Sequence, residues 1–503
     1  MKFTDMTTQI NRYDVDKSSK LYRFIEIMIP LLVWATIFMP VWLSFFHPAV
    51  AAYLILGYMI YFFYKAMKTA YYSMVSFRLM KRVEQIDWLA EVKQIEGHRD
   101  IHHFILVVNY KESVAKLVAT MEYLTKQNYD LKKIHVVFGM EVREGNAAKE
   151  RSAEITEKFG TVFGSMDTTY HEIAPGEAIG KASNATHAAK FISETARQLN
   201  IPAEKVVVTV CDADSLLPPN YLACVTYKFL VNPESQYHFY AAPVLLYNNF
   251  WKLPMPVRVQ TILSSVARFA YLSQEDVLIQ ISTYSTNLSL IETIGYWDTD
   301  VIPEDWHIWM QAFFTLGDKV KTIPIYMPII RDGLLSTSLI KTFKARYEQE
   351  KRWAWGVTDI PYALIRSFHS PQINFVIKLK RVLHICETHF FWPTSFFLLT
   401  VSASIPPLVN PIFSRTVFGF LLPKLSSFIL TLSSVVLILS IYLDYKLRER
   451  AKIKTDLRNV PMLFIQWYLL PVISLLFSSL PALEAHTRML MGKKLEYKVQ
   501  EKV

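Results

Sequence analysis

The sequence predicts an α/β domain inserted between transmembrane helices. Three observations lead to this fold class. Runs without a charged residue lie near both ends of the chain, short β-branched runs alternate with helical stretches between them, and 52% of the residues are hydrophobic while 19% are charged. That composition is too apolar for a soluble protein but retains the charge that a soluble domain needs. We therefore expect a membrane hairpin and linker in residues 1–97, the α/β domain in 98–360, and an interfacial segment with further membrane helices in 361–503.

Two charge-free runs near the beginning of the chain predict a helical hairpin. They cover Ile27–Phe46 and Pro48–Tyr64, and each has about the length that crosses a bilayer. Lysines and arginines flank the hairpin on both sides and are absent from its turn at His47. The positive-inside rule therefore predicts that both flanks lie in the cytoplasm.

Three more charge-free runs, near the end of the chain, predict further spans. They cover Phe390–Phe413, Leu425–Leu443 and Asn459–Leu483, and prolines make the first of them irregular. We therefore expect a multi-pass protein of the plasma (inner) membrane with about five spans. Five crossings place the end of the chain outside, yet the loop 444–458 and the last residues are basic and favour the cytoplasm. Either one span is re-entrant or the tail departs from the rule.

The charge and the cysteines exclude other classes of protein. A net charge of +10 on so apolar a chain indicates basic loops that face anionic lipid, and we expect no nucleic-acid partner. The three cysteines Cys211, Cys224 and Cys386 are too widely spaced for a disulfide framework or a zinc site.

The middle of the chain has the pattern of a parallel sheet. Phe104–Val108, Ile134–Phe138 and Val206–Val210 are short apolar runs, and a helical stretch, Ser113–Gln127, follows the first. Ligands of such sheets bind at the carboxyl ends of the strands, so we expect the polar residues after each run to gather there. The chain contains no glycine-rich dinucleotide or phosphate loop, which disfavours a dehydrogenase or an ATPase.

Two acidic motifs are candidates for chemistry. Asp212-Ala213-Asp214 directly follows an apolar run, and two carboxylates in this position can hold a divalent cation against phosphate oxygens. Acidic pairs also commonly cap turns. Farther along, Glu304-Asp305 contains a carboxylate that can take a proton from an attacking hydroxyl. The same residues, after Pro303, also fit the first turn of a helix, and the two interpretations are compatible.

A third motif combines a cation with an aromatic ring. Gln349-Glu350-Lys351-Arg352-Trp353 lies on a basic helical stretch, in which Arg352 can pair with a diphosphate and Trp353 can stack on a sugar. Taken alone, this stretch fits an amphipathic helix beside the membrane better. The same choice, membrane-facing or buried, applies to an expected helix in Asn248–Tyr271.

In their order, the motifs resemble those of the membrane-bound glycosyltransferases of family 2, which include cellulose, hyaluronan, chitin and poly-N-acetylglucosamine synthases. The resemblance runs from about residue 100 to 360, and the flanking spans extend it over most of the chain. The matching stretches are V-N-Y-K-E (Val108–Glu112), G-K-A-S-N-A (Gly180–Ala185), D-A-D (Asp212–Asp214), T-N-L-S-L (Thr286–Leu290), E-D (Glu304–Asp305) and Q-E-K-R-W (Gln349–Trp353).

The resemblance implies a GT-A-type, Rossmann-like catalytic domain on the cytoplasmic side and a role for each matched residue. The catalytic pair would be Asp305, the general base, with Glu304. Asp212 and Asp214 would hold Mg²⁺ or Mn²⁺. Donor contacts would fall on Tyr110, Glu112, Glu141, Lys181, Asp212 and Arg352, and acceptor contacts on Gln349, Trp353 and Asn287.

Two positions depart from the family pattern. Gly139-Met140-Glu141 stands where the family usually has paired aspartates, so either Glu141 takes over the contact with the base or the nucleotide is held differently. Pro303 replaces the usual threonine before the acidic pair, and Trp306 follows it. Because of this second departure, the resemblance does not determine the residues of the acceptor pocket.

The resemblance also implies a reaction. We expect an inverting single displacement that moves sugar from a nucleotide-diphosphate donor, a UDP-sugar, to a growing β-linked polysaccharide, with secretion through the protein's own spans. The expected partners are the donor, a glycan or lipid-linked acceptor, membrane lipids and accessory export proteins. A non-processive transferase that acts on a lipid or a short glycan is one alternative. An inactive transferase-like scaffold or transporter is the other, and failure to turn over any nucleotide sugar would favour it.

Overall fold

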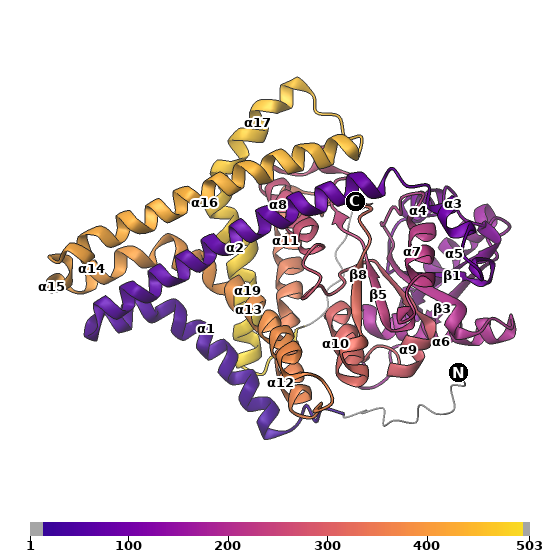
Figure 1. Ribbon diagram of the computed structural model, residues 1–503, viewed down its shortest axis with the longest axis horizontal. Coiled ribbons are helices and arrows are strands. Elements are labelled where there is room, and N and C mark those ends of the chain that lie inside the picture. Colours follow the sequence, from indigo (N-terminus) through magenta and orange to yellow (C-terminus); the bar gives the residue numbers. More distant parts are fainter. Residues whose placement is uncertain (1–13, 496–503) are drawn as a thin grey trace.

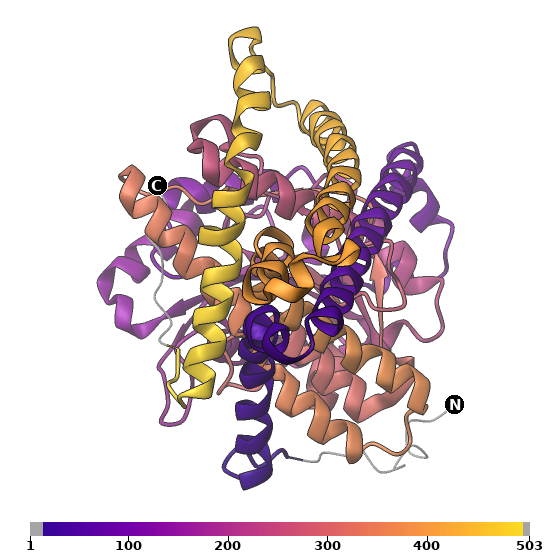
Figure 2. The same ribbon diagram turned by 90° about the vertical axis from the view of Figure 1, so that its left-hand side faces the viewer.

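The computed structural model describes residues 14–495. Figure 1 shows an α/β domain on the right and a group of long helices that extends away from it to the left. These helices come from both ends of the chain. The first two helices and those near the end of the sequence lie side by side in both views (Figure 2). The α/β domain is formed by the middle of the sequence.

The α/β domain is built on a mixed seven-stranded sheet with a two-stranded sheet beside it. The strands are β1 (His102–Val108), β2 (Ile134–Glu141), β3 (Ser165–His171), β4 (Val206–Asp212), β5 (His238–Ala241), β7 (Tyr284–Asn287) and β8 (Lys321–Pro324) in the large sheet, with β6 (Val244–Leu245) and β9 (Ile329–Ile330) in the small one. In space, the large sheet runs β3-β2-β1-β4-β7-β5-β8. The strands β1 to β4 are parallel, and β7 runs antiparallel between β4 and β5.

The three strands expected from the sequence are confirmed as β1, β2 and β4. Their unbroken apolar character follows from burial on both faces of the sheet. In β1, Phe104 and Leu106 face a core that includes α6 and α10, whereas Ile105 and Val107 face a second core that includes α4 and α7. The antiparallel strand β7 was not predicted, because its sequence Y-S-T-N has no apolar run.

Ten α-helices lie between the end of the first membrane hairpin and residue 368. They are α3 (Trp88–Lys93), α4 (Val114–Leu124), α5 (Asn146–Phe159), α6 (Lys181–Gln198), α7 (Tyr221–Leu230), α8 (Met255–Tyr271), α9 (Leu288–Ile294), α10 (Glu304–Leu316), α11 (Leu339–Ala354) and α12 (Asp359–Phe368). The helix α8 lies within Asn248–Tyr271, where a helix was expected, and its Ile262, Val266 and Phe269 pack against the long helices α2 and α16. It therefore joins the domain to the long helices.

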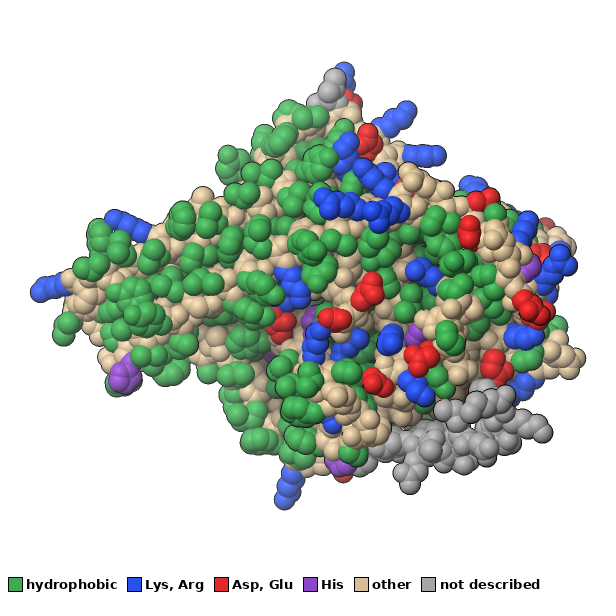
Figure 3. All heavy atoms as spheres, in the orientation of Figure 1, with side chains coloured by type: hydrophobic (Ala, Val, Ile, Leu, Met, Phe, Trp, Pro, Cys, Tyr) green, Lys and Arg blue, Asp and Glu red, His purple; other side chains and the backbone are tan. Residues whose placement is uncertain are grey.

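The remaining helices form the extended part of the molecule. They are α1 (Lys20–Phe46), α2 (Pro48–Val83), α13 (Phe375–Thr400), α14 (Ile405–Val409), α15 (Pro411–Ser414), α16 (Val417–Arg450), α17 (Val460–Ile465), α18 (Leu470–Ser474) and α19 (Leu480–Leu490). Their surface carries apolar side chains over most of the face in Figure 3. Apolar residues exposed on this scale are typical of a lipid-facing surface.

Four helical stretches of the described chain are long and apolar enough to cross a membrane. By length and composition these are α1, α2, α16 and the continuous stretch Val460–Leu490, and a fifth forms if α13 is counted with the short helices after it, across a bend of 48°. These findings agree with a membrane protein of four or five candidate spans. The orientation of the α/β domain and the identity of the membrane stay predictions.

Candidate active site

A cavity of about 630 Å³ lies at the carboxyl ends of β1, β2 and β4. It continues past α10 and α11 to α13, where Thr388 and Trp392 line it. Every predicted site residue except Asn287 lines this cavity: Tyr110, Glu112, Glu141, Lys181, Asp212, Asp214, Glu304, Asp305, Gln349, Arg352 and Trp353. The fold therefore brings motifs more than 240 residues apart to one place, while their individual roles stay predictions.

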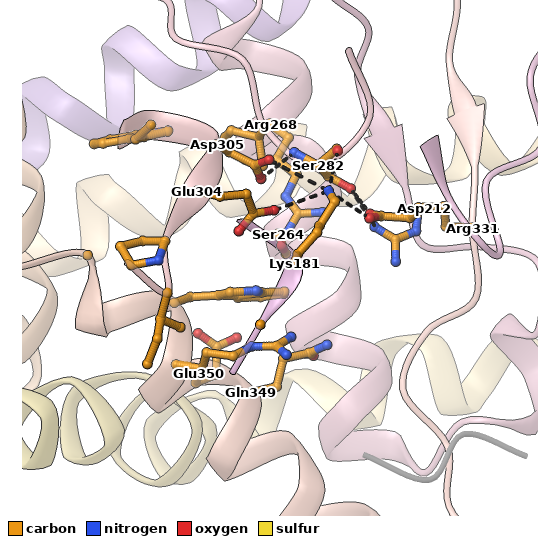
Figure 4. A pocket seen from close by; sticks show the side chains of 18 of the residues that line it. Lys181, Asp212, Ser264, Arg268, Ser282, Glu304, Asp305, Arg331, Gln349 and Glu350 are labelled. Carbon is orange, nitrogen blue, oxygen red and sulfur yellow. Dashed lines mark hydrogen bonds and ion pairs between the residues drawn. The ribbon is translucent and has the colours of Figure 1, made fainter. Parts of the chain in front are cut away.

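Lys181, the first residue of α6, lies among three carboxylates of the cavity (Figure 4). Its Nζ is 2.9 Å from Asp212 Oδ1, 3.1 Å from Glu304 Oε1 and 3.7 Å from Asp305 Oδ1. Although burial alone would lower the pKa of Lys181, the three acids outweigh it and raise that pKa well above its ordinary value. Lys181 is therefore a permanent cation that ties the D-A-D and E-D motifs together.

Arg331, which follows β9, contacts both aspartates of the D-A-D motif. Its Nε donates to Asp214 Oδ1 at 2.8 Å, and its Nη1 forms an ion pair with Asp212. Burial alone would raise the pKa of Asp212, but Arg331 and Lys181 outweigh it and hold that pKa below its usual range. Sequence reasoning missed Arg331, which belongs to no recognised motif.

The acidic pair as arranged does not fit a resident divalent cation. Among the residues that the structure describes, no group of three or more His, Cys, Asp or Glu side chains is placed to hold a metal ion. Mg²⁺ and Mn²⁺ prefer about six oxygen ligands, and Arg331 already engages both aspartates. A cation could take these carboxylates only if Arg331 left them. The metal role of Asp212 and Asp214 therefore stays a prediction.

The E-D pair lies in the first turn of α10, so the helix-terminus interpretation is correct alongside any catalytic one. Ser282 holds Asp305 in place: its backbone N–H donates to Asp305 Oδ2 at 2.7 Å, and its hydroxyl bonds Asp212. Ser282 has a φ of 71°, a conformation that non-glycine residues rarely adopt. Such strain recurs at functional sites. Burial and the charge of Asp305 raise the pKa of Glu304, so Glu304 keeps its proton to higher pH than an ordinary glutamate.

The Q-E-K-R-W motif occupies the last turns of α11, where two arginines contact the ring of Trp353. The guanidinium carbons of Arg268 and Arg346 are 5.0 and 5.1 Å from the centroid of the Trp353 ring. Arg346 is buried, and its Nη1 donates to Gln349 Oε1 at 2.6 Å. Cation–π contacts of this kind fix the orientation of the ring. The motif therefore presents its tryptophan to the cavity, and α11 is more than a surface helix.

The loop after β1 contributes an aromatic ring, that of Tyr110, to the lining of the cavity. The guanidinium carbon of Arg143 is 4.1 Å from the centroid of the Tyr110 ring, and Arg143 also pairs with Glu141. Glu112 Oε2 accepts a hydrogen bond from the Tyr110 backbone N–H at 2.6 Å. These contacts fix the direction of the loop after β1, with the ring of Tyr110 lining the cavity.

The structure does not bring Asn287 to the cavity. Its side-chain amide donates to the carbonyls of Ala203, Glu204 and Val206, at distances of 2.9 to 3.3 Å. Because β7 runs antiparallel to β4, Asn287 pairs with Val207 at the amino end of β4, the edge away from Asp212. Its contacts are those of a structural residue, and the expected acceptor contact has no support from its position.

Comparison with known families identifies part of this region. Residues 207–447, just under half of the chain, match the family model for glycosyl transferase family group 2. The match begins in β4 and ends in α16, so it contains the D-A-D, E-D and Q-E-K-R-W motifs. No curated protein matches the chain.

Three solved structures show a distant likeness. The mannosyltransferase PcManGT from Pyrobaculum calidifontis, solved with GDP-Man and Mn²⁺, is 15% identical with a TM-score of 0.40, over 84% of this chain and 99% of its own. Residues 1–349 of TarS from S. aureus, with UDP-GlcNAc, are 13% identical with a TM-score of 0.37, over 69% and 92%. GalNAc-T7 with UDP, GalNAc and Mn²⁺ is 10% identical with a TM-score of 0.34, over 58% of each chain. TM-scores this low carry no argument about substrate or metal. Residues 207–447 are therefore similar to glycosyl transferase family group 2, and the described chain also contains helices long and apolar enough to span a membrane.

Proposed function

We propose that the protein is an inverting glycosyltransferase of the plasma membrane that adds sugar from a UDP-sugar to the end of a growing β-linked polysaccharide. One observation carries the proposal: a single cavity is lined by the D-A-D, E-D and Q-E-K-R-W motifs together. A displacement reaction needs a held leaving group and a base on the acceptor, within reach of one anomeric carbon.

In this proposal the donor lies between the ends of β1 and β4. Tyr110, stacked with Arg143, faces the nucleotide base, and Glu141 contacts the base edge. The diphosphate lies toward Arg352 and Lys181, since cations stabilise the charge that develops on a leaving diphosphate. Asp212 and Asp214 would hold Mg²⁺ or Mn²⁺ only if Arg331 moved away from both carboxylates.

Asp305 is the general base of the proposed reaction. The Ser282 backbone N–H binds its Oδ2, while Oδ1 is buried without a hydrogen-bond partner and is 3.7 Å from Lys181. That oxygen can accept the proton of an acceptor hydroxyl as the hydroxyl attacks. A single attack opposite the leaving group inverts the anomeric centre, which accounts for a β-linked product from an α-linked donor.

The acceptor end of the cavity is aromatic and lies beside the long helices. Trp306, Trp353 and Trp392 all line it, and flat rings suit the faces of sugars. This lining favours a glycan acceptor. Export through the protein's own spans, with or without accessory proteins, and a cytoplasmic catalytic domain belong to the same proposal.

A non-processive reaction on a lipid-linked acceptor is the second candidate. The cavity reaches Ser474 and Ser478 of the apolar stretch Val460–Leu490, so a short acceptor with a lipid anchor would also be accommodated. The inactive scaffold or transporter gains no support from the site, whose motif carboxylates are intact.

Donor turnover tests the proposal. Purified protein in nanodiscs would be offered UDP-glucose, UDP-N-acetylglucosamine and GDP-mannose, with magnesium, with manganese and with a chelator, and diphosphate release and product size would be followed. A long product from a UDP-sugar is the expected result. A product with one added sugar would establish the second candidate, and no release from any donor would contradict both.

A further inference from the structure

The last apolar stretch of the chain, Val460–Leu490, has the composition of a membrane span. A helix of its 31 residues is about 46 Å long, more than the roughly 30 Å of the hydrocarbon core. If it crossed the membrane, only one of its ends could lie near the α/β domain.

The beginning and middle of this stretch contact the domain. Just before it, Trp251 Nε1 donates to the carbonyl of Lys454 at 2.8 Å. Near its start, Arg258 Nη1 is 3.3 Å from Met462 Sδ. Farther along, Gln260 Nε2 donates to the Phe477 carbonyl at 3.2 Å. Arg258 and Gln260 both lie on α8, so the stretch packs against this helix both near its start and at its middle.

The end of the stretch also contacts the domain. Glu484 accepts hydrogen bonds from Tyr347, at 2.9 Å, and from Lys351, at 3.0 Å, both on α11. The last two carbonyls of α19, those of Met489 and Leu490, accept hydrogen bonds from Arg23 at 2.8 and 2.6 Å. Arg23 lies in the first turn of α1, the end from which α1 extends away from the domain.

The path of the stretch explains how both halves reach the domain. Figures 1 and 2 show it running across the molecule, whereas α2 and α16 run lengthwise. It is broken by a π-helical turn, Leu475–Ser479, with a non-helical residue at Phe477. Pro461, Pro471 and Pro481 recur every ten residues. Proline and π turns bend helices, so the stretch can follow the surface of the domain.

Its two faces differ in what they contact. Phe464, Tyr468, Val472 and Leu476, spaced by four, form an exposed apolar stripe. On the other side, Ser474 and Ser478 line the active-site cavity.

We propose that Val460–Leu490 does not cross the membrane but lies along its boundary, as the wall between the active-site cavity and the lipid. Its partner is the lipid leaflet on the domain's side, which the apolar stripe enters. The chain then crosses four times, in α1, α2, α13–α15 and α16. At the far end of the molecule, Asn410 donates to the carbonyl of Ser44, and α16 returns to the domain, where Tyr247 donates to Asp444 at 2.9 Å.

This placement resolves the conflict in the charge pattern. Residues 491–495 then lie on the same side as the 444–458 loop, so Lys493 and Lys494 share the side of the other basic flanks. Lys498 and Lys502, which also belong to the basic last residues of the sequence, lie outside the described residues.

Cysteine labelling in sealed vesicles tests the side on which the chain ends. Lys494→Cys and Arg415→Cys would be made at two exposed positions. Both would carry Cys386→Ala, because Cys386 is only partly buried, whereas Cys211 and Cys224 are buried and can remain. Cleavage of the α/β domain by added protease, in a separate sample, identifies vesicles in which the domain faces outward. In intact vesicles of this orientation, we expect a membrane-impermeant maleimide to label Lys494→Cys and to reach Arg415→Cys only after detergent. Protection of both positions would overturn the proposal.

Depth measurement provides a second readout that needs neither substrate nor activity. Spin labels at Phe464, Val472 and Leu476 would be compared for collision with oxygen and with a water-soluble nickel reagent. A boundary segment gives three similar, shallow depths. A span gives increasing depth toward Leu476, near its middle, and that result would overturn the proposal. Failure of the proposed glycosyl transfer would change neither experiment.

Discussion

Asp305 is the residue whose replacement discriminates most sharply between binding and chemistry. In Asp305→Asn the Ser282 N–H keeps an oxygen acceptor, but the side chain no longer takes a proton from an attacking hydroxyl. Because general bases contribute about 10²- to 10⁴-fold, we expect transfer to fall by that range while nucleotide binding, measured by calorimetry, is preserved. Asp300→Asn, at an exposed ion pair with Lys17, is the control. Full activity of Asp305→Asn would remove the residue from its role.

Arg331 decides how the D-A-D pair meets a cation. Removing it takes one cation away from both aspartates and leaves Asp212 paired with Lys181, and carboxylates with fewer cationic partners attract divalent cations. In Arg331→Gln we therefore expect Mn²⁺ to bind the nucleotide-free protein at least about tenfold more tightly, equivalent to about 1.4 kcal/mol. Calorimetry or manganese spin resonance would measure this. Arg143→Gln, which breaks the pair with Glu141, is the matched control. Equal Mn²⁺ affinity in the wild type and Arg331→Gln would refute the expectation.

Among the elements, α10 is joined to α12 by a charge network around the buried His307. His307 Nδ1 is 2.7 Å from Asp359 Oδ1, and its Nε2 is 2.8 Å from Asp298 Oδ2. Burial alone would lower the pKa of His307, but Asp359 and Asp298 outweigh it and raise it to about 9. His307 is two residues from Asp305, so the network also positions the turn that contains Asp305.

The raised pKa of His307 predicts how stability changes with pH. Between about pH 6.5, the ordinary value, and about 9, the folded protein holds a proton that the unfolded chain releases. This contribution is complete below pH 6.5 and is lost as the pH rises to 9, by at most roughly 3 kcal/mol. We expect the apparent melting temperature to fall across this window, and the fall to be smaller in His307→Gln. Identical pH profiles for the two proteins would contradict the charge network.

The membrane helices offer a matched pair of glycines. A Cβ at Gly419, in α16, would lie 2.0 Å from the Phe413 carbonyl oxygen, whereas one at Gly57, in α2, meets nothing within 4 Å. Gly419→Ala must therefore shift backbone, at a cost of about 1–3 kcal/mol. Gly57→Ala removes a flexible residue from a helix and should not destabilise. Thermal unfolding in one detergent would compare the melting temperatures of the two variants. Equal values would show that the backbone of the turn before α16 shifts without cost.

At the scale of the whole molecule, the catalytic domain depends on the helices around it. The stretch Val460–Leu490 covers Val259 of α8 and Phe343 of α11, and α2 and α16 cover Ile262 and Val266. Expressed alone as residues 98–360, the domain would expose these side chains as one apolar face. We expect it to need detergent, as judged by gel filtration with and without detergent. A monodisperse, detergent-free domain would show that 98–360 is an independent unit.

The sequence alone was sufficient where a local pattern carries the information. The β-branched runs of β1, β2 and β4 and the long α1, α2 and α16 follow from periodicity and length, because burial on all sides and the thickness of a bilayer constrain composition directly. Eleven of the twelve expected site residues line one cavity, because polar residues after parallel strands share an edge.

Tertiary structure decided what depends on distant partners. Arg331 reaches the aspartates because Leu216, just after β4, pairs with Ile330, a contact across more than a hundred residues. Asn287 lies away from the cavity because β7 runs antiparallel to β4, which places Asn287 at the amino end of β4. Val460–Leu490 has the composition of a span, yet its contacts keep both halves on the domain. Composition measures how apolar a segment is, whereas the neighbours of its two ends determine whether lipid covers all of it or only one face.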